Sequence, residues 1–576
     1  MNLPEMTRKH LLILSIVSAL IVLSCIPLEM ARAMTWEQIQ EKSEVHGGLI
    51  VHLGCGDGRL TTALGAGGPY IVQGLDTDAE EVAAARAHIK SKGRYGNVSA
   101  DVFDGRHVPY IDNLVNLIVV EKLGAVTMDE VMRVLAPGGV AHIRRDGKWT
   151  SRVKPWPKDI DEWTHYMHDA TGNAVAHDTV VGPPRRLQWV GSPRWGRHHD
   201  HMSSVSAVVT SGGRLFYIID EAPRFSILIA PQWKLVARDA FNGTILWKRS
   251  IGQWYDHLHR LKSGPAQLPR RLVAQGDRVY VTLGLDDPIS VLDAATGETV
   301  ATYQSTAGTD EILISDGIIL ALIGGESAPS ATAKSKREDL NDSSGQLDGK
   351  LVALRAESGE VLWRSPYSVV KLALAMNEKY VVLLSDDRIL CLDKSSGDLI
   401  WRSEPVARAE KFPVRSGPTL LLYEDVVLFA GAELAAENNR TWKVEQNDTL
   451  TALSIKDGTV LWKAPHPLSG YASPEDVLVA GGRVWIGETT SGHAVGKFVG
   501  RDVHTGEVVS EFDPDVETYW FHHRCYRGKA TERFLLMSRT GTEFIDFEQK
   551  HWDINHWVRG ACLYGVMPAN GLLYAP

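Results

Sequence analysis

Histidine and arginine side chains collect in three short stretches beyond residue 190. These stretches are Arg197-His198-His199-Asp200-His201, Asp256-His257-Leu258-His259-Arg260 and His522-His523-Arg524. Neutral imidazole binds transition metals, and guanidinium groups bind anions. The candidate metal ligands are His199, His201, His257 and His523. An anionic ligand and a solvated polar rim are the alternatives, because neighbouring side chains of an extended chain point to opposite sides.

A second set of residues, near residue 50, could bind a nucleotide-like ligand. An apolar strand over 49–53 is followed by the loop Gly54-Cys55-Gly56-Asp57-Gly58 and by the start of a helix at Arg59. Glycines let the backbone approach a ligand, and a helix N-terminus favours a polar or carboxylate group. A second apolar strand ends in Asp76, about 20 residues further on, where such folds hold a ribose hydroxyl.

The following segments alternate between strand and helix, as in an α/β fold. They are a helix over 79–90, Asp104 before Val108-Pro109, a strand over 114–120, a helix over 128–135 and a strand over 140–143. In this order, residues 47–145 resemble class I S-adenosylmethionine-dependent methyltransferases. The resemblance implies S-adenosylmethionine as cofactor, with Gly54 and Gly56 at its methionine end, Asp76 on the ribose and Asp104 beside the adenine.

Three features depart from that family pattern. His52 and Asn116 stand where the family usually has acids in the first and fourth strands. After Ile143 the chain is expected to leave the domain without the last two strands of the full sheet. No substrate-binding motif is visible. These departures favour the fold without efficient turnover.

The remainder of the chain repeats one hairpin pattern six times. The first copy runs from Ala237 to Trp247, and the six copies have their turns at Gly243, Gly297, Gly359, Gly397, Gly458 and Gly506. Glycine is expected there because the turn requires positive φ, and flanking apolar residues alternate as in half-buried strands. A spacing of about 40 to 60 residues without helical periodicity predicts a propeller of seven to eight four-stranded blades.

The turn pattern Ala-x-Asp-x-x-x-Gly-x-x-x-Trp resembles the quinoprotein-type, or PQQ-like, propeller repeat. The resemblance implies that the Trp packs between neighbouring blades; Tyr303 and Phe512 replace it in two copies. Pyrroloquinoline quinone (PQQ) is then a candidate cofactor. Asp200 and Asp256 qualify as catalytic acids by position alone, and the adjacent Cys pair of many such enzymes is missing.

The ends of the repeat region suggest how the ring closes. The pattern of a last blade strand appears before the first blade, at Leu187-Gln188-Trp189, as expected if an N-terminal strand closes the ring. The pattern of the first strand of an eighth unit appears at Asn570-Gly571-Leu572-Leu573-Tyr574. Together they account for half a blade. Either the ring has seven blades and a stub, or the sequence is shorter than the natural protein; we favour the second because open strand edges are normally covered.

The N-terminus predicts export. Arg8-Lys9-His10 precedes an apolar run over 11–28, and Ala31-Arg32-Ala33 supplies small residues for cleavage. We expect a periplasmic or cell-surface protein, with an uncleaved membrane anchor as the alternative. The predicted division is a signal peptide over 1–33, a methyltransferase-like domain over 34–145, a linker over 146–186 and a propeller over 187–576.

The net charge and the cysteine spacing bear on which ligands and cross-links are expected. A net charge of -9 leaves no basic footprint, so nucleic acid is not expected as a partner. Cys55, Cys391, Cys525 and Cys562 lack zinc-site spacing. Cys525 and Cys562 pair if the chain is exported, or they are buried thiols.

Three functions compete. The first is a methyltransferase-like protein whose propeller binds a small molecule or protein. The second is an exported scaffold without enzyme activity, and the third is a PQQ-dependent oxidoreductase.

Overall fold

The computed structural model describes residues 35–576 except for several short segments. The segments left out are 194–195, 198–204, 259–264, 325–347, 409–416, 432–449, 467–476, 488–496, 516–525, 538–541, 556 and 563. The predicted signal segment 1–33 lies outside the described residues. Among the residues that are described, no helix is long and apolar enough to cross a membrane.

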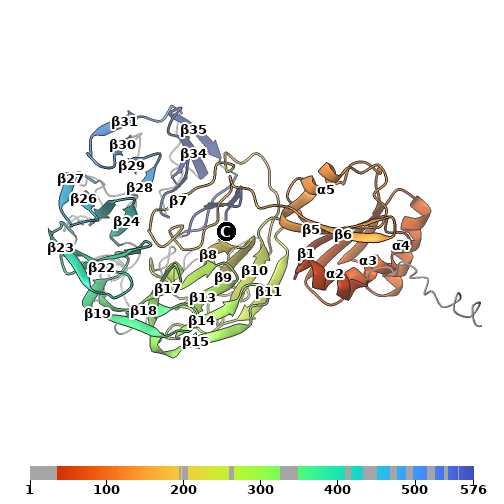
Figure 1. Cartoon of the computed structure of the whole chain (residues 1–576), viewed down its shortest axis with the longest axis horizontal. Helices are drawn as coiled ribbons and strands as arrows, with labels where there is room; N and C mark the ends of the chain where they lie inside the picture. Colours follow the sequence, from red (N-terminus) through yellow and green to blue (C-terminus); the bar gives the residue numbers. More distant parts are fainter. Residues whose placement is uncertain are drawn as a thin grey trace, which may run out of the picture.

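The first domain is a six-stranded sheet covered by helices on both faces, to the right of the ring in Figure 1. The strand order is β3-β2-β1-β4-β5-β6, with β1 to β5 parallel and β6 antiparallel. The strands are β1 Gly48–Leu53, β2 Tyr70–Asp76, β3 Val98–Val102, β4 Val115–Val120, β5 Leu135–Arg145 and β6 Lys148–Val153. The helices are α2 Trp36–Ser43, α3 Arg59–Leu64, α4 Ala79–Ser91 and α5 Met128–Val134.

Burial on both faces explains why the central strands are apolar throughout. The helices α2, α3 and α4 pack on one face of the sheet, and α5 packs on the other. The helix α4 begins at the cap Asp78, whose carboxylate accepts the backbone N–H groups of Glu80 and Glu81. Strand β6 corrects the predicted end of this domain at residue 145, because a hairpin adds residues 148–153 to the sheet.

Over the described residues, the second domain is a ring of six four-stranded sheets, one five-stranded sheet and one two-stranded sheet (Figure 1). The first four sheets comprise β8 Val205–Ser211, β9 Arg214–Asp220, β10 Trp233–Asp239, β11 Ile245–Ser250; β12 Leu272–Gln275, β13 Arg278–Thr282, β14 Ile289–Asp293, β15 Thr299–Tyr303; β16 Thr309–Ser315, β17 Ile318–Gly324, β18 Asp348–Arg355, β19 Val361–Val370; β20 Leu374–Met376, β21 Tyr380–Ser385, β22 Arg388–Asp393 and β23 Leu399–Pro405.

The remaining sheets complete the circle back to the first blade. They comprise β24 Thr419–Tyr423, β25 Val426–Ala430, β26 Leu450–Ser454, β27 Val460–Ala464; β28 Leu478–Ala480, β29 Arg483–Gly487, β30 Phe498–Asp502, β31 Val508–Phe512; β32 Lys529–Thr531, β33 Phe534–Leu536, β34 Thr542–Asp546, β35 His551–Asn555; and β36 Met567–Ala569 with β37 Leu572–Tyr574. The two-residue strand β7 Val175–Ala176 pairs with β32. Residues 570–574 therefore hold a turn and the second strand of the eighth sector, whereas we predicted its first strand.

The aromatic residue at the end of each hairpin joins neighbouring blades, as predicted. The Trp247 indole N–H donates to the Ala294 carbonyl at 3.0 Å, and a Cβ on Gly297 would lie 2.6 Å from the Trp247 ring. Glycine is therefore required there for space as well as for its positive φ of 74°. Tyr303 makes the equivalent contact through its hydroxyl, which donates to the Ala356 carbonyl at 2.6 Å.

Trp189 makes the same contact where the ring closes. Its indole N–H donates to the Ala240 carbonyl at 3.0 Å, and its ring lies against Gly243 of the first hairpin. The predicted closure by an N-terminal segment is confirmed for this contact, although residues 187–189 are not paired as a strand.

Residues 161–178, hereafter the strap, run along the innermost strands of the ring. Backbone N–H groups from all eight sectors donate to the strap in ring order, from Thr210, Ala274, Ile314, Met376, Leu422, Val479, Ala530 and Asn570. Their acceptors lie on Trp163, Thr164, His165, Ala170, Thr171, Asn173, Ala174 and Asp161 respectively. The stretch predicted as a linker therefore ties the whole ring together.

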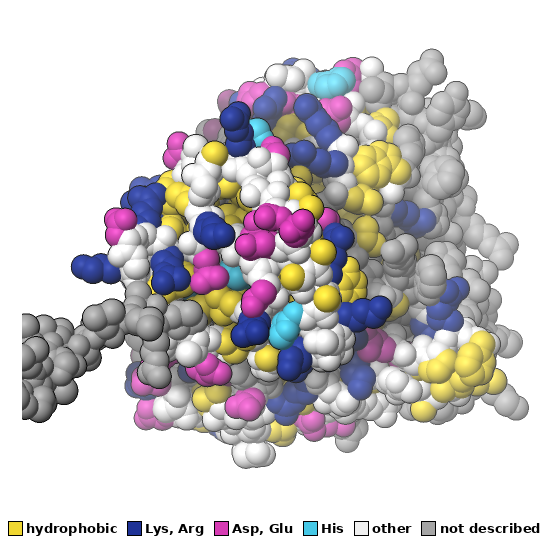
Figure 2. Space-filling view, turned by 90° about the vertical axis from the view of Figure 1, so that its right-hand side faces the viewer, with side chains coloured by type: hydrophobic (Ala, Val, Ile, Leu, Met, Phe, Trp, Pro, Cys, Tyr) yellow, Lys and Arg dark blue, Asp and Glu magenta, His cyan; other side chains and the backbone are white. Residues whose placement is uncertain are grey.

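The two domains meet at the amino-terminal edge of the first sheet. Asn116, at the start of β4, donates to the Asp239 carboxylate at 2.6 Å, and Asn242 donates to the Leu114 carbonyl at 2.9 Å. Gly47, just before β1, lies against Leu246. Figure 2 views the molecule from the side of the first domain. The carboxyl-terminal edge of its sheet is thus the edge away from these contacts.

Candidate functional site

The four predicted cofactor-binding residues come together at the carboxyl-terminal edge of the first sheet. Gly54 and Gly56 follow β1 with φ values of 76° and 50°, and Asp76 ends the neighbouring strand β2. The backbone N–H of Phe103 donates to the Asp76 carbonyl at 3.1 Å, which brings Asp104 to the same edge. In open α/β sheets, this is the edge where ligands bind.

Asp76 is held between two loops. Its Oδ2 accepts the Gly56 N–H at 3.1 Å, and its Oδ1 accepts the N–H groups of Thr77 at 2.8 Å and Asp78 at 3.2 Å. A carboxylate oxygen has two acceptor sites, so Oδ2 keeps one for a ligand hydroxyl. The side chain is buried, so its orientation is fixed before a ligand arrives.

Asp104 is more exposed and is engaged locally. Its Oδ1 accepts the N–H groups of Arg106 and His107, and its Oδ2 lies 2.7 Å from the His107 Nδ1. The hydrogen bond from the His107 backbone, followed by the one from its side chain, lowers the pKa of Asp104 to about 2. Asp104 therefore stays ionised at neutral pH.

The glycine loop leaves no room for side chains. A Cβ on Gly54 would lie 3.0 Å from Lys122 backbone and side-chain atoms, and a Cβ on Gly58 would lie 2.7 Å from Ala85. Both glycines also have positive φ. These positions therefore fit a loop that lets the backbone approach a cofactor.

The unusual His52 has an acidic partner on another strand. The His52 ring is fully buried, with Nδ1 2.8 Å from the Thr61 hydroxyl and Nε2 3.5 Å from a Glu121 carboxylate oxygen. The hydrogen bond to His52 lowers the pKa of Glu121. We did not single out Glu121 from the sequence; its place directly after the fourth apolar strand was the available signal.

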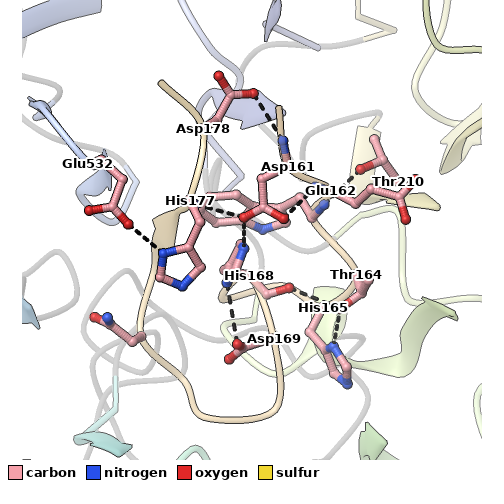
Figure 3. A network of polar contacts seen from close by, with 12 residues as sticks. Asp161, Glu162, Thr164, His165, His168, Asp169, His177, Asp178, Thr210 and Glu532 are labelled. Atoms are coloured by element: carbon pink, nitrogen blue, oxygen red, sulfur yellow. Dashed lines mark hydrogen bonds and ion pairs between the residues drawn. The ribbon is translucent and has the colours of Figure 1, made fainter. Parts of the chain in front are cut away.

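The strap carries the densest polar network of the ring, shown in Figure 3. His168 lies between two carboxylates, with Nε2 2.7 Å from Asp161 and Nδ1 3.5 Å from Asp169. Burial alone would lower the pKa of His168, but the hydrogen bonds to both acids raise it to about 9. The ring is therefore a buried imidazolium at neutral pH.

His165 is also buried, but in the neutral form. Its Nε2 accepts the Ile314 N–H at 3.1 Å, and its Nδ1 lies 2.7 Å from the Thr164 hydroxyl. Burial lowers the pKa of His165 to about 4, so the ring is neutral. His177 closes the network, because its N–H donates to Asp161 at 2.7 Å and its ring contacts Glu532 (Figure 3).

Cationic side chains at the starts of the inner strands are neutralised or enclosed. Arg270 pairs with Glu311, and Lys371 pairs with Asp310. The Lys529 ammonium lies 4.0 Å from the centre of the Tyr564 ring and donates to the Tyr564 carbonyl at 3.0 Å. Burial lowers the pKa of Lys529.

Two family models match separate parts of the chain. The model described as "Methyltransferase domain" matches residues 50–139, and the PQQ-like repeat model described as "Outer membrane protein assembly factor BamB" matches residues 347–512. The chain combines a methyltransferase domain with a PQQ-like propeller.

Individual relatives resemble one domain each. Methyltransferase GfsG of Streptomyces halstedii is 31% identical over 120 residues, which are 20% of this chain and 43% of that protein. The chain thus spans less than half the length of this curated relative. Europium-containing methanol dehydrogenase covers 70% of this chain and 86% of its own, with 10% identity and a TM-score of 0.42. Quinohemoprotein alcohol dehydrogenase from Comamonas testosteroni covers 70% and 74%, with 12% identity and a TM-score of 0.41.

Most of the predicted histidine sites of the propeller lie outside the described residues. These are His199, His201 and His523, together with Asp200. His257 is described; its Nδ1 lies 4.0 Å from Asp256, whose carboxylate also accepts the Leu258 N–H at 2.9 Å. A metal or anion site formed by these histidine and arginine stretches therefore stays a prediction.

Two carboxylates at the inner-strand starts are not available to a calcium ion that would hold a quinone, and the PQQ cofactor stays a prediction. Such a site needs a carboxylate available to the metal, whereas Asp310 and Glu311 at the inner-strand starts are each paired with a cation. Elsewhere on the ring, Glu424, Asp425 and His504 place ligand atoms within 4.8 Å of one another on exposed turns. His504 pairs with Asp425 at 2.9 Å, so an ion pair accounts for this group.

Two of the four cysteines beyond residue 34 are buried. Cys55 and Cys391 are buried thiols, and burial raises the pKa of each to about 12. Cys525 lies outside the described residues, so its pairing with Cys562 stays a prediction.

Proposed function

We propose that the methyltransferase domain binds S-adenosylmethionine and transfers its methyl group to an acceptor, while the propeller binds a separate partner. The convergence of Gly54, Gly56, Asp76 and Asp104 at one sheet edge carries this proposal. The match of residues 50–139 to the methyltransferase model supports it.

Each of these residues has a distinct part in holding the cofactor. The backbone at Gly54 and Gly56 lies beside the methionine end, the fixed Asp76 carboxylate accepts the ribose hydroxyls, and Asp104 faces the adenine. When bound, S-adenosylmethionine supplies an electrophilic methyl group, whose bonding electron pair stays on sulfur while the acceptor gives up a proton. Glu121 lies beside this edge, and its contact with His52 lowers its pKa.

We infer that the propeller is a separate binding module, and the position of its contacts with the first domain supports this. Its contacts with Asn116 and Leu114 lie at the opposite end of the strands from Gly54 and Asp76. A strand of six residues spans about 20 Å. The propeller residues that make these contacts therefore lie far from the cofactor edge. A small molecule or protein bound by the propeller would be a partner separate from the methyl acceptor. We also propose that residues 1–33 direct export to the periplasm or cell surface.

Calorimetry of the full-length protein with S-adenosylmethionine tests the proposal. Asp76→Ala removes the carboxylate at the ribose position, and we expect binding to weaken at least about tenfold, because a hydrogen bond to a charged group is worth about 1.5–3 kcal/mol. Asp112→Ala is the matched control, since this acid precedes β4 at the opposite edge and pairs with Arg133. If S-adenosylmethionine does not bind to the unmodified protein, the proposed methyltransferase activity is wrong and the scaffold without enzyme activity is the remaining function.

A further inference from the structure

The cofactor edge of the methyltransferase domain divides into two differently charged halves. Over β2 and β3 it carries the carboxylates of Asp76 and Asp104. Over β4, β5 and β6 cations outnumber acids, because Lys122, Arg144, Arg145 and Lys148 stand against Glu121 and Asp146. We call Lys122, Arg145 and Lys148 the cationic rim. Lys122 follows β4 by two residues, Arg145 ends β5 and Lys148 begins β6. All three side chains are exposed.

The rim brings like charges together without neutralising them. Arg145 and Lys148 are directly paired across the β5–β6 hairpin, so their side chains leave the same face of the sheet as neighbours. Like charges directly opposite each other destabilise an antiparallel pair. Over residues 35–576, outside the gaps given above, no carboxylate lies within ion-pair distance of any of the three rim cations.

Arg144 shows that the same hairpin can neutralise a cation. Its guanidinium lies 3.8 Å from Glu121, which His52 also contacts. The neighbouring Arg145 has no such acid, although Asp146 follows it directly in sequence. The positive charge of the rim is therefore left available to an anion.

The rim lies within reach of the position assigned to the transferred methyl group. Gly54 lies against Lys122, since a Cβ there would be 3.0 Å from Lys122 atoms. Strands β1 and β5 both border β4, so they lie about 10 Å apart. With the adenosine over the acidic half, an acceptor approaching the methyl group from the other half meets the rim.

We propose that the methyl acceptor is a small molecule carrying a carboxylate or phosphate group, which the cationic rim binds. This inference rests on the function proposed above. A small acceptor fits better than a polyanion, because both charge signs are interspersed on the face in Figure 2 and the chain carries a net charge of -9.

Calorimetry of the full-length protein with inorganic phosphate and with succinate tests the rim, in the presence of saturating S-adenosylhomocysteine. The test variant is Arg145→Gln with Lys148→Gln, and the matched control is Arg152→Gln, an exposed cation of the same edge strand toward the opposite edge. We expect the double variant to weaken binding of at least one anion about tenfold or more. The control variant should leave it unchanged, as should a titration with S-adenosylhomocysteine alone for both variants.

The possible outcomes separate the two proposals. If neither anion binds, or if Arg152→Gln weakens binding as much as the double variant does, the rim is not an acceptor site. If S-adenosylhomocysteine fails to bind, the proposed function is lost, and the anion titration without it still reports on the rim. A preference for phosphate over succinate, or the reverse, identifies the group that the acceptor carries.

Discussion

A contact between a histidine and an aspartate, 2.7 Å long in each case, occurs in both domains in opposite surroundings. In the methyltransferase domain, His107 lies 2.7 Å from Asp104, and the two side chains are 78% and 54% exposed. In the propeller, His168 lies 2.7 Å from Asp161, and the two side chains are 8% and 25% exposed. Solvent screens the His107–Asp104 pair, so a ligand can displace this contact at little cost. The second pair is inside the ring and has no such freedom.

This difference separates the part of the molecule suited to binding from the part that maintains its shape. At the sheet edge the polar groups are presented by loops around glycines, and the carboxylates keep capacity for a ligand. At the ring axis the polar groups satisfy one another, and the strap accepts a hydrogen bond from every sector. Buried ionisable groups are therefore a guide to function only when their partners are known.

Replacement of His168 should give the largest effect. His168→Asn tolerates the positive φ of 75° but leaves the half-buried carboxylates of Asp161 and Asp169 without their cation. We expect the free energy of unfolding of the propeller to fall by about 3–5 kcal/mol, as when one partner of a buried ion pair is removed. Urea unfolding followed by tryptophan fluorescence measures it.

His107→Asn is the control for this experiment. It removes the corresponding imidazole from the exposed pair with Asp104, and the unfolding midpoint should not change. Equal losses in the two variants would show that the strap pair is as well solvated as the surface pair, which contradicts the comparison.

The two strap histidines predict a stability maximum near neutral pH. The raised pKa of His168, about 9 against an ordinary 6.5, gives stability that is fully present below pH 6.5 and is lost as the pH rises through 9. The lowered pKa of His165, about 4, gives stability that is present above pH 6.5 and is lost as the pH falls through 4. Each limb has a slope of up to about 1.4 kcal/mol per pH unit.

Urea unfolding as a function of pH assigns each limb. His168→Asn should remove the alkaline limb, and His165→Gln should remove the acidic limb above the range where carboxylates titrate. A pH profile that neither substitution alters would mean that other groups control stability.

Asn116 tests how firmly the two domains are joined. Its side chain donates to Asp239 at 2.6 Å, and burial raises the pKa of Asp239. Asn116→Asp should place two carboxylates in contact and weaken the docking by about 1–3 kcal/mol. Because one of them can take up a proton, docking should return as the pH is lowered. Small-angle scattering at pH 5 and pH 8 measures the separation, with Asp112→Asn as control; a compact profile at both pH values would contradict this account.

The sequence predicted those features that depend on one residue type at a fixed position. The turn glycines were predictable because positive φ and the neighbouring ring both exclude a side chain, as at Gly297 beside Trp247. Gly54, Gly56, Asp76 and Asp104 were predictable because the carboxyl ends of neighbouring parallel strands meet at one edge. Asn116 was counted among the departures that favour a fold without efficient turnover, but this residue lies at the edge opposite Gly54 and Asp76 and joins the domains.

The strap could not be predicted, because its partners are mostly backbone groups. Trp163, Thr164 and Ala170 accept N–H groups through their carbonyls, which every residue type possesses. The pairing of Glu121 with His52 was missed for a related reason, since it joins two strands that are 69 positions apart in numbering, from 52 to 121. Such contacts follow from the folded topology and leave no local pattern.

We call the contact between two neighbouring blades a seam, and the smallest expected effect lies at the seam where the ring closes. Trp189 and Tyr574 both donate to the Ala240 carbonyl at 3.0 Å. At an ordinary seam, the Trp401 indole donates to the Ile455 carbonyl at 2.7 Å. Trp401→Phe should therefore cost about 1 kcal/mol, whereas Trp189→Phe should cost less because Tyr574 still satisfies the acceptor.

Double substitution measures this shared bond at the closing seam. Trp189→Phe combined with Tyr574→Phe should cost more in urea unfolding than the sum of the two single changes, because only the double variant leaves the buried Ala240 carbonyl without its side-chain donors. Additive losses would mean that the two donors act independently. Each donor would then contribute its own hydrogen bond, and Trp189→Phe would cost as much as Trp401→Phe.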